Sequence, residues 1–133
     1  MTSLLIVDDD ARMRTLIRSI VADLVDSVSE CSDGADAQAM YAEQHPDWVF
    51  MDVAMPLVNG LTATFKIKGY DPKARIIIVT GQESPTLRAQ AESAGAFGFV
   101  MKDDLLELRG ILGQSERPIQ TAEAFGLLTE KDQ

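Results

Sequence analysis

The chain has 133 residues, of which 46% are hydrophobic and 25% charged, so we expect one globular domain that buries a core without disulfides or a structural metal. Its 21 acidic and 12 basic residues give a net charge of −9, which argues against direct binding to nucleic acid, because phosphate backbones are bound by basic patches. Neither a membrane-spanning apolar stretch nor a secretory signal is recognisable, so we expect a cytoplasmic protein without membrane contacts. The single cysteine, Cys31, excludes an intramolecular disulfide and is expected to be a small buried hydrophobe.

Short apolar runs alternate with helical patterns along the chain. The predicted strands cover residues 3–7, 27–31, 48–51, 75–79 and 97–101. The predicted helices cover residues 11–24, 34–43, 61–68, 85–95 and 103–112. Five strand–helix units in a row predict an α/β fold, with an all-parallel sheet and helices on both faces.

Three of the predicted helices show an apolar face at helical spacing. For the last helix, the face is either core or a dimer surface, with core favoured by the amphipathic pattern. The predicted faces are Met13, Leu16, Ile17, Ile20, Val21 and Leu24 on the first helix, Ala35, Ala39 and Ala42 on the second, and Leu105, Leu108 and Leu112 on the last.

Polar residues follow four of the predicted strands at the point where each apolar run stops. Asp8-Asp9-Asp10 follow the first strand, Asp52 the third, Thr80 the fourth and Lys102 the fifth. Ligands of open α/β sheets bind outside the carboxyl ends of the strands, so acids, a hydroxyl and an ammonium group are expected at one edge. That set of groups is suited to a divalent cation and a phosphoryl group.

These residues resemble the receiver domain of bacterial two-component response regulators. The resemblance covers about residues 3–112, and we expect a receiver domain at 1–113 followed by a tail or linker at 114–133 without a second domain. It implies a flavodoxin-like (βα)5 doubly wound parallel sheet with strand order 2-1-3-4-5, which brings the first, third, fourth and fifth strands together. The matching elements are Val7-Asp8-Asp9, residues 52–60 with Met55, Pro56 and Gly60, Thr80-Gly81, Phe99 and Lys102.

The resemblance implies that Asp52 accepts a phosphoryl group and that Mg²⁺ is the cofactor. Asp9 and Asp52 would coordinate the ion directly, Asp8 mainly through water, and Ala54 through its backbone carbonyl. Crowded carboxylates favour a bound cation, and Mg²⁺ prefers oxygen ligands. By itself, Asp52 would be read as an aspartate that caps a turn.

Three further residues are implied to sense the phosphoryl group. Lys102 would be its counter-charge, and the Thr80 hydroxyl would donate to a phosphoryl oxygen. Phe99 is either a switch residue that turns inward or an ordinary core residue. It lacks the hydroxyl of the tyrosine found in many family members, so only packing could report the switch.

The sequence departs from the family pattern at two positions, and one acid has a plainer interpretation. Gly81 stands where alanine is frequent, which gives the loop more backbone freedom. Asp103 stands where proline is usual, so we expect either a trans bond after Lys102 with a shifted loop or a strained bond. Asp10 is expected to be a helix N-cap or a solvated acid.

The leading hypothesis is a phosphorylatable switch that takes its phosphoryl group from a histidine kinase or phosphotransfer protein and then changes its affinity for a downstream protein. The alternatives are a phosphorylation-independent interaction module and a receiver that is part of a longer transcriptional regulator. A phosphorylation-dependent homodimer stays open, as does the role of the tail. A phosphatase or mutase is disfavoured because Ala54 occupies the place of their second acid, and flavin is disfavoured because Asp8-Asp9-Asp10 would repel its phosphate. We therefore expect no turnover enzyme.

Overall fold

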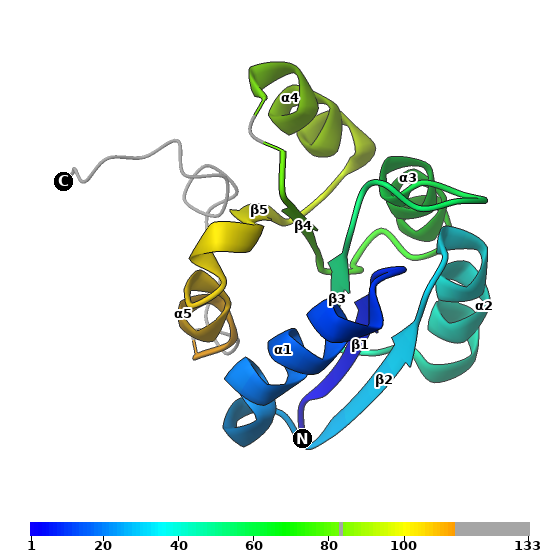
Figure 1. Ribbon diagram of the computed structural model, residues 1–133. Coiled ribbons are helices and arrows are strands. Elements are labelled where there is room, and N and C mark those ends of the chain that lie inside the picture. The colour runs from blue at the N-terminus through cyan, green and yellow to red at the C-terminus, as the bar shows by residue number, and fades with distance from the viewer. Residues whose placement is uncertain (83, 114–133) are drawn as a thin grey trace, which may run out of the picture.

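The computed structural model describes residues 1–82 and 84–113, which form a five-stranded parallel sheet flanked by helices (Figure 1). The strand order is β2-β1-β3-β4-β5, so the predicted flavodoxin-like topology is confirmed. The bounds are β1 (Ser3–Val7), α1 (Ala11–Val21), β2 (Ser27–Cys31), α2 (Gly34–Gln44), β3 (Trp48–Met51), α3 (Gly60–Tyr70), β4 (Ile76–Thr80), α4 (Pro85–Ala94), β5 (Gly98–Met101) and α5 (Glu107–Gly113), with 3-10 turns at Ala22–Leu24 and Lys102–Asp104.

The sheet separates two apolar cores because successive side chains of a strand point to opposite faces. On one face, Leu5 and Val7 of β1 belong to the core that α2, α3 and α4 cover. On the other, Leu4 and Ile6 belong to the core that α1 and α5 cover (Figure 1). Leu105, Leu108 and Leu112 are buried in this second core, so the core interpretation of that face is confirmed.

Side-chain caps fix where four helices begin. The carboxylates of Asp10 and Asp33 accept hydrogen bonds from the N–H groups of Arg12 and Ala35, at the starts of α1 and α2. Asn59 and Ser84 accept in the same way at the starts of α3 and α4. Each cap satisfies an N–H group that has no partner within its helix. The predicted capping role of Asp10 is therefore confirmed.

The predicted apolar face of α2 was wrong. Ala35, Ala39 and Ala42 are exposed, whereas Ala37 and Tyr41 are buried. The predicted face and the observed face are both compatible with helical spacing, and Tyr41 decides between them. Its ring packs in the core while its hydroxyl donates to the Asp71 carboxylate at 2.7 Å. On α1, Leu16 was predicted to lie on the apolar face but is exposed. The buried face of this helix is centred on Ile17 and Val21.

Several predicted element ends were also wrong. The helix expected from Asp103 begins only at Glu107, because Lys102–Asp104 forms a separate 3-10 turn that carries the two acids. Helix α3 continues through Gly69 to Tyr70, since a solvent-facing glycine weakens a helix without breaking it. None of the peptide bonds in the described ranges is cis, so the Lys102–Asp103 bond is trans.

Cys31 is only half-buried, beside the core that α2, α3 and α4 cover, so the prediction that it is fully buried was wrong. Burial raises the pKa of its thiol to about 11, which leaves it unreactive at neutral pH. Within residues 1–82 and 84–113, we find no helix with the length and apolar character needed to cross a membrane.

Candidate functional site

The carboxyl ends of β1 and β3 place two aspartates side by side. Hydrogen bonding continues one residue beyond each strand: the Asp52 N–H donates to the Val7 carbonyl at 2.9 Å, and the Asp8 N–H to the Cys31 carbonyl at 3.1 Å. Asp8 is 2% and Asp52 6% exposed, although both carry carboxyl groups. Burial of two acids at adjacent strand ends is costly unless a cation accompanies them.

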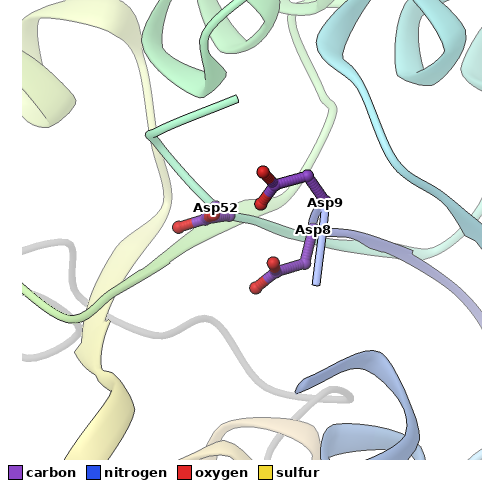
Figure 2. Close-up of side chains that lie close together, drawn as sticks. All are labelled: Asp8, Asp9 and Asp52. Atoms are coloured by element: carbon purple, nitrogen blue, oxygen red, sulfur yellow. The ribbon is translucent and has the colours of Figure 1, made fainter. Parts of the chain in front are cut away.

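Three acids converge at this edge, as the sequence predicted. One carboxylate oxygen from each of Asp8, Asp9 and Asp52 lies within 4.8 Å of the other two (Figure 2). Asp9 is exposed, whereas Asp8 is buried. The orientation of Asp8 is fixed because its Oδ1 accepts a hydrogen bond from the Asp10 N–H at 2.8 Å. The cluster therefore offers oxygen ligands to a cation from two strands.

Lys102 provides a positive charge to the same cluster. Its Nζ lies 3.0 Å from Asp8 Oδ2 and 3.4 Å from Asp52 Oδ1, so the predicted salt bridge is present. Although burial lowers the pKa of Lys102, its contacts with the two carboxylates outweigh this and raise the pKa overall. Burial, followed by the charge of Asp8, raises the pKa of Asp52 to about 6, and Lys102 offsets this only in part. Further positive charge would therefore stabilise the ionised cluster.

The cluster opens into a cavity of about 450 Å³ at the edge of the sheet. Thr80 is buried at the end of β4, and its Oγ1 accepts a hydrogen bond from the Gln82 N–H at 3.2 Å. The cavity therefore brings together the acids, the hydroxyl and the ammonium group that the strand ends predicted. Its lining residues are Asp8, Asp9, Asp10, Asp52, Val53, Ala54, Thr80, Gly81, Gln82 and Lys102.

Comparison with known proteins identifies the family. The family described as the response regulator receiver domain matches residues 4–112. The chain belongs to this family. It is 39% identical to the chemotaxis protein CheY of Halobacterium salinarum over 98 residues, or 74% of this chain and 82% of that protein. It is 41% identical to CheY of Bacillus subtilis over 100 residues, or 74% and 83%. A LuxR-family response regulator structure from Aurantimonas sp. superimposes with a TM-score of 0.76 at 28% identity, covering 93% of each chain.

In this receiver domain, Phe99 lies in the core that α2, α3 and α4 cover. It is 3% exposed, and the guanidinium carbon of Arg88 on α4 lies 4.4 Å from its ring centroid. The core interpretation of Phe99 therefore describes its position. Its role as a switch stays a prediction.

The loop after β3 leads from Asp52 to the start of α3. Met55 packs partly against the core, whereas Ala54 and Pro56 are exposed. Gly60 lies directly against the backbone of Asp52, and a Cβ there would lie 1.9 Å from the Asp52 carbonyl oxygen. No other residue type fits at Gly60 without moving the backbone that carries Asp52.

Two residues next to the site were missed from the sequence. The Arg14 guanidinium donates to the Asp8 carbonyl at 2.6 Å and to Glu30 Oε1 at 2.9 Å, which ties α1 to the ends of β1 and β2. Asp33 caps α2 and also contacts the loop after β3. An available signal for Asp33 was its position: like Asp8 and Asp52, it follows a predicted strand closely and precedes a helix.

Proposed function

We propose that this receiver domain accepts a phosphoryl group on the Asp52 carboxylate. The observation that carries the proposal is the placement of Lys102 Nζ 3.0 Å from Asp8 and 3.4 Å from Asp52, beside a cavity that also holds Thr80. A carboxylate can act as a phosphoryl nucleophile, and phosphoryl transfer depends on positioning and on charge stabilisation. The cavity offers the Asp52 carboxylate as a nucleophile, the Lys102 ammonium group as a positive charge and the Thr80 hydroxyl as a donor.

The donor is a phosphohistidine of a histidine kinase or phosphotransfer protein. An Asp52 carboxylate oxygen forms the new bond to phosphorus as the P–N bond breaks, and the imidazole nitrogen leaves with the electron pair and takes up a proton. Lys102 then pairs with a phosphoryl oxygen, and the Thr80 hydroxyl donates to another. The product is an aspartyl phosphate.

The acidic cluster fits a divalent cation, for which Mg²⁺ is the family cofactor. Three carboxylates within 4.8 Å, two of them buried, form the oxygen-rich donor set that Mg²⁺ prefers. Asp9 and Asp52 would hold the ion directly, Asp8 mainly through water, and Ala54 through its carbonyl oxygen. Bound Mg²⁺ would neutralise charge on the transferring phosphoryl group.

The output of this site is a change in protein binding, not turnover of a small substrate. Phosphorylation adds a charge of about −1.5 to −2 and strong acceptor oxygens beside Thr80. Movement of Thr80 would alter the packing around Phe99 and so the affinity for a downstream protein partner, or for a second copy of the chain. Because Ala54 provides no acid two residues after Asp52, we propose no further catalytic activity. We also propose that the protein acts in the cytoplasm.

The test is intact-protein mass spectrometry after incubation with Mg²⁺ and acetyl phosphate. We expect one hydroxylamine-labile phosphoryl group on the wild type and none on Asp52→Asn. Asp104→Asn, an equal change at an exposed acid outside the cavity, should be phosphorylated like the wild type. A wild type without an adduct, or an adduct that persists in Asp52→Asn, overturns the proposal. In that case, partner binding that is insensitive to beryllofluoride would identify a phosphorylation-independent module.

A further inference from the structure

The loop of residues 53–59 begins at the proposed phosphoacceptor and carries the Ala54 carbonyl. Much of it is exposed, including Ala54, Pro56 and Leu57. Its ends are nevertheless held, because the Gly60 N–H donates to the Val53 carbonyl at 2.9 Å and Asn59 caps α3. What holds the middle of the loop decides how well the Ala54 carbonyl is placed.

Asp33 holds the middle of this loop. One carboxylate oxygen, Oδ2, accepts hydrogen bonds from the N–H groups of Leu57 at 3.0 Å and Val58 at 3.2 Å. The other, Oδ1, accepts from the Ala35 N–H at 2.8 Å and caps α2. Asp33 is 6% exposed, so these bonds form largely away from solvent.

The neighbouring backbone adds a further contact with the same loop. The Gly34 N–H donates to the Val58 carbonyl at 3.2 Å. A Cβ on Gly34 would lie 2.4 Å from that oxygen, so the close approach requires glycine. The turn between β2 and α2 is therefore built against the loop that follows Asp52.

A helix cap alone does not account for this arrangement. Capping α2 requires only Oδ1, and Asn or Ser would serve as well as Asp. Only a carboxylate has a second oxygen that can accept two more N–H bonds, and bonds to a charged acceptor are stronger than neutral ones. These hydrogen bonds to the backbone N–H groups of Ala35, Leu57 and Val58 lower the pKa of Asp33, so the carboxylate is ionised at neutral pH.

We propose that Asp33 is a positioning residue for phosphoryl transfer, whose carboxylate fixes the 53–59 loop so that the Ala54 carbonyl and Asp52 keep the spacing that the cation needs. This inference rests on the proposed function. Replacing a residue that contacts and orients the metal ligands, without binding the metal itself, typically lowers metal affinity or activity 10–100-fold.

Asp33→Asn separates the loop contact from the cap. Its single side-chain oxygen can still cap α2, while its NH₂ group would face the donors of Leu57 and Val58 and accept from neither. Asp33→Ser is a second variant that keeps a cap but is too short to satisfy both elements. Ser84→Ala is the matched control, because it removes a helix cap at α4, away from the 53–59 loop.

The experiment measures Mg²⁺ affinity by calorimetry with the metal alone, the Mg²⁺ dependence of phosphorylation by acetyl phosphate, and unfolding in urea. For both Asp33 variants we expect at least a tenfold weaker Mg²⁺ affinity and most of the phosphorylation rate restored at saturating Mg²⁺. Ser84→Ala should lose stability with Mg²⁺ affinity unchanged.

The outcomes separate this inference from the proposed function. Folded Asp33 variants with wild-type Mg²⁺ affinity overturn the positioning role, even if Asp52→Asn abolishes phosphorylation. Loss of stability in the Asp33 variants without a shift in Mg²⁺ affinity also overturns it, because that result describes a cap only. Failure of the wild type to accept a phosphoryl group overturns the proposed function, while the Mg²⁺ affinities still test Asp33.

Discussion

The two halves of the site are held in different ways. At the ends of β1 and β3, Asp8 and Asp52 are buried, and the loop after Asp52 is held by Asp33 and by the close approach of Gly60. At the end of β4, Gly81 and Gln82 are exposed, and a Cβ on Gly81 would meet Lys102 Cδ at 3.9 Å, an ordinary contact. The half with the acids is tightly packed, whereas the loop that follows the buried Thr80 is exposed and loosely packed.

This difference matches the two tasks that the proposed function requires. A nucleophile and its cation ligands need fixed spacing, because small displacements of reacting groups slow a reaction strongly. A segment that reports phosphorylation must instead adopt two arrangements of similar free energy. A side chain added in place of glycine should therefore destabilise the protein at Gly60 and stabilise it at Gly81.

The largest expected effect comes from Gly60→Ala. The new Cβ would lie 1.9 Å from the Asp52 carbonyl oxygen, so the backbone at Asp52 must shift. We expect a loss of about 3 kcal/mol in the free energy of unfolding, together with loss of phosphorylation.

Gly69→Ala on the same helix is the control. No atom lies within 4 Å of a Cβ there, so alanine should stabilise α3 by about 1 kcal/mol. Urea unfolding measures both variants. Equal stabilities for the two would show that the packing around Asp52 tolerates displacement.

The second effect is a pH-dependent gain in stability from Asp52→Asn. The pKa of Asp52 is raised from 3.8 to about 6 in the folded protein, so between these values the folded state binds more protons than the unfolded state. The protonated Asp52 carboxyl therefore contributes to the free energy of unfolding at low pH, and this contribution is lost as the pH rises through about 6. Without Mg²⁺, Asp52→Asn should be more stable than the wild type by about 1–2 kcal/mol at pH 7, after allowance for solvent screening in the open cavity.

The measurement is urea unfolding of both proteins between pH 4 and pH 8 with a chelator present. The difference should be small near pH 4 and should grow until about pH 7. A difference that shrinks with rising pH would contradict the raised pKa.

The sequence predicted the charged and polar residues of the site better than the contacts that hold them in place. Local patterns predict that Asp8, Asp52, Thr80 and Lys102 lie at one edge, because a parallel sheet aligns its carboxyl ends. The strand order that makes them neighbours was implied by the family resemblance. The contacts of Asp33 with Leu57 and Val58 join residues 24 and 25 positions apart, and no local pattern encodes them.

The helix faces and ends that were predicted wrongly have a similar cause. On α2, alanines occupy both sides of the helix, and the buried side is determined by Tyr41, whose hydroxyl donates to Asp71 at the end of α3. The late start of α5 follows from the 3-10 turn at Lys102–Asp104, which places Lys102 beside the acids. Tertiary contacts decided these features over local propensity.

A smaller effect is expected for Arg88→Met, on α4, the helix that follows the exposed loop after Thr80. The guanidinium of Arg88 lies over the Phe99 ring, an arrangement worth about 0.5–1 kcal/mol at a partly exposed site. Methionine replaces the aliphatic part of the arginine side chain and removes the charged guanidinium. Urea unfolding should therefore report a decrease of that size in the free energy of unfolding. Arg12→Met, at an exposed position of α1, is the control and should change stability less. An equal loss in both variants would contradict a specific contact with Phe99.

The smallest effect is expected for Gly81→Ala, and its sign is opposite to that of Gly60→Ala. Gly81 does not have a positive φ angle, and its Cβ would make only the ordinary contact with Lys102 Cδ at 3.9 Å. Alanine should therefore stabilise the protein by about 0.4–1 kcal/mol, because it restricts the unfolded chain. If the freedom of this loop serves the switch, the same variant should also narrow the difference in partner affinity between the free and the beryllofluoride-bound protein. Destabilisation by Gly81→Ala would show instead that the end of β4 is packed as tightly as the end of β3, and the contrast between the two halves would fail.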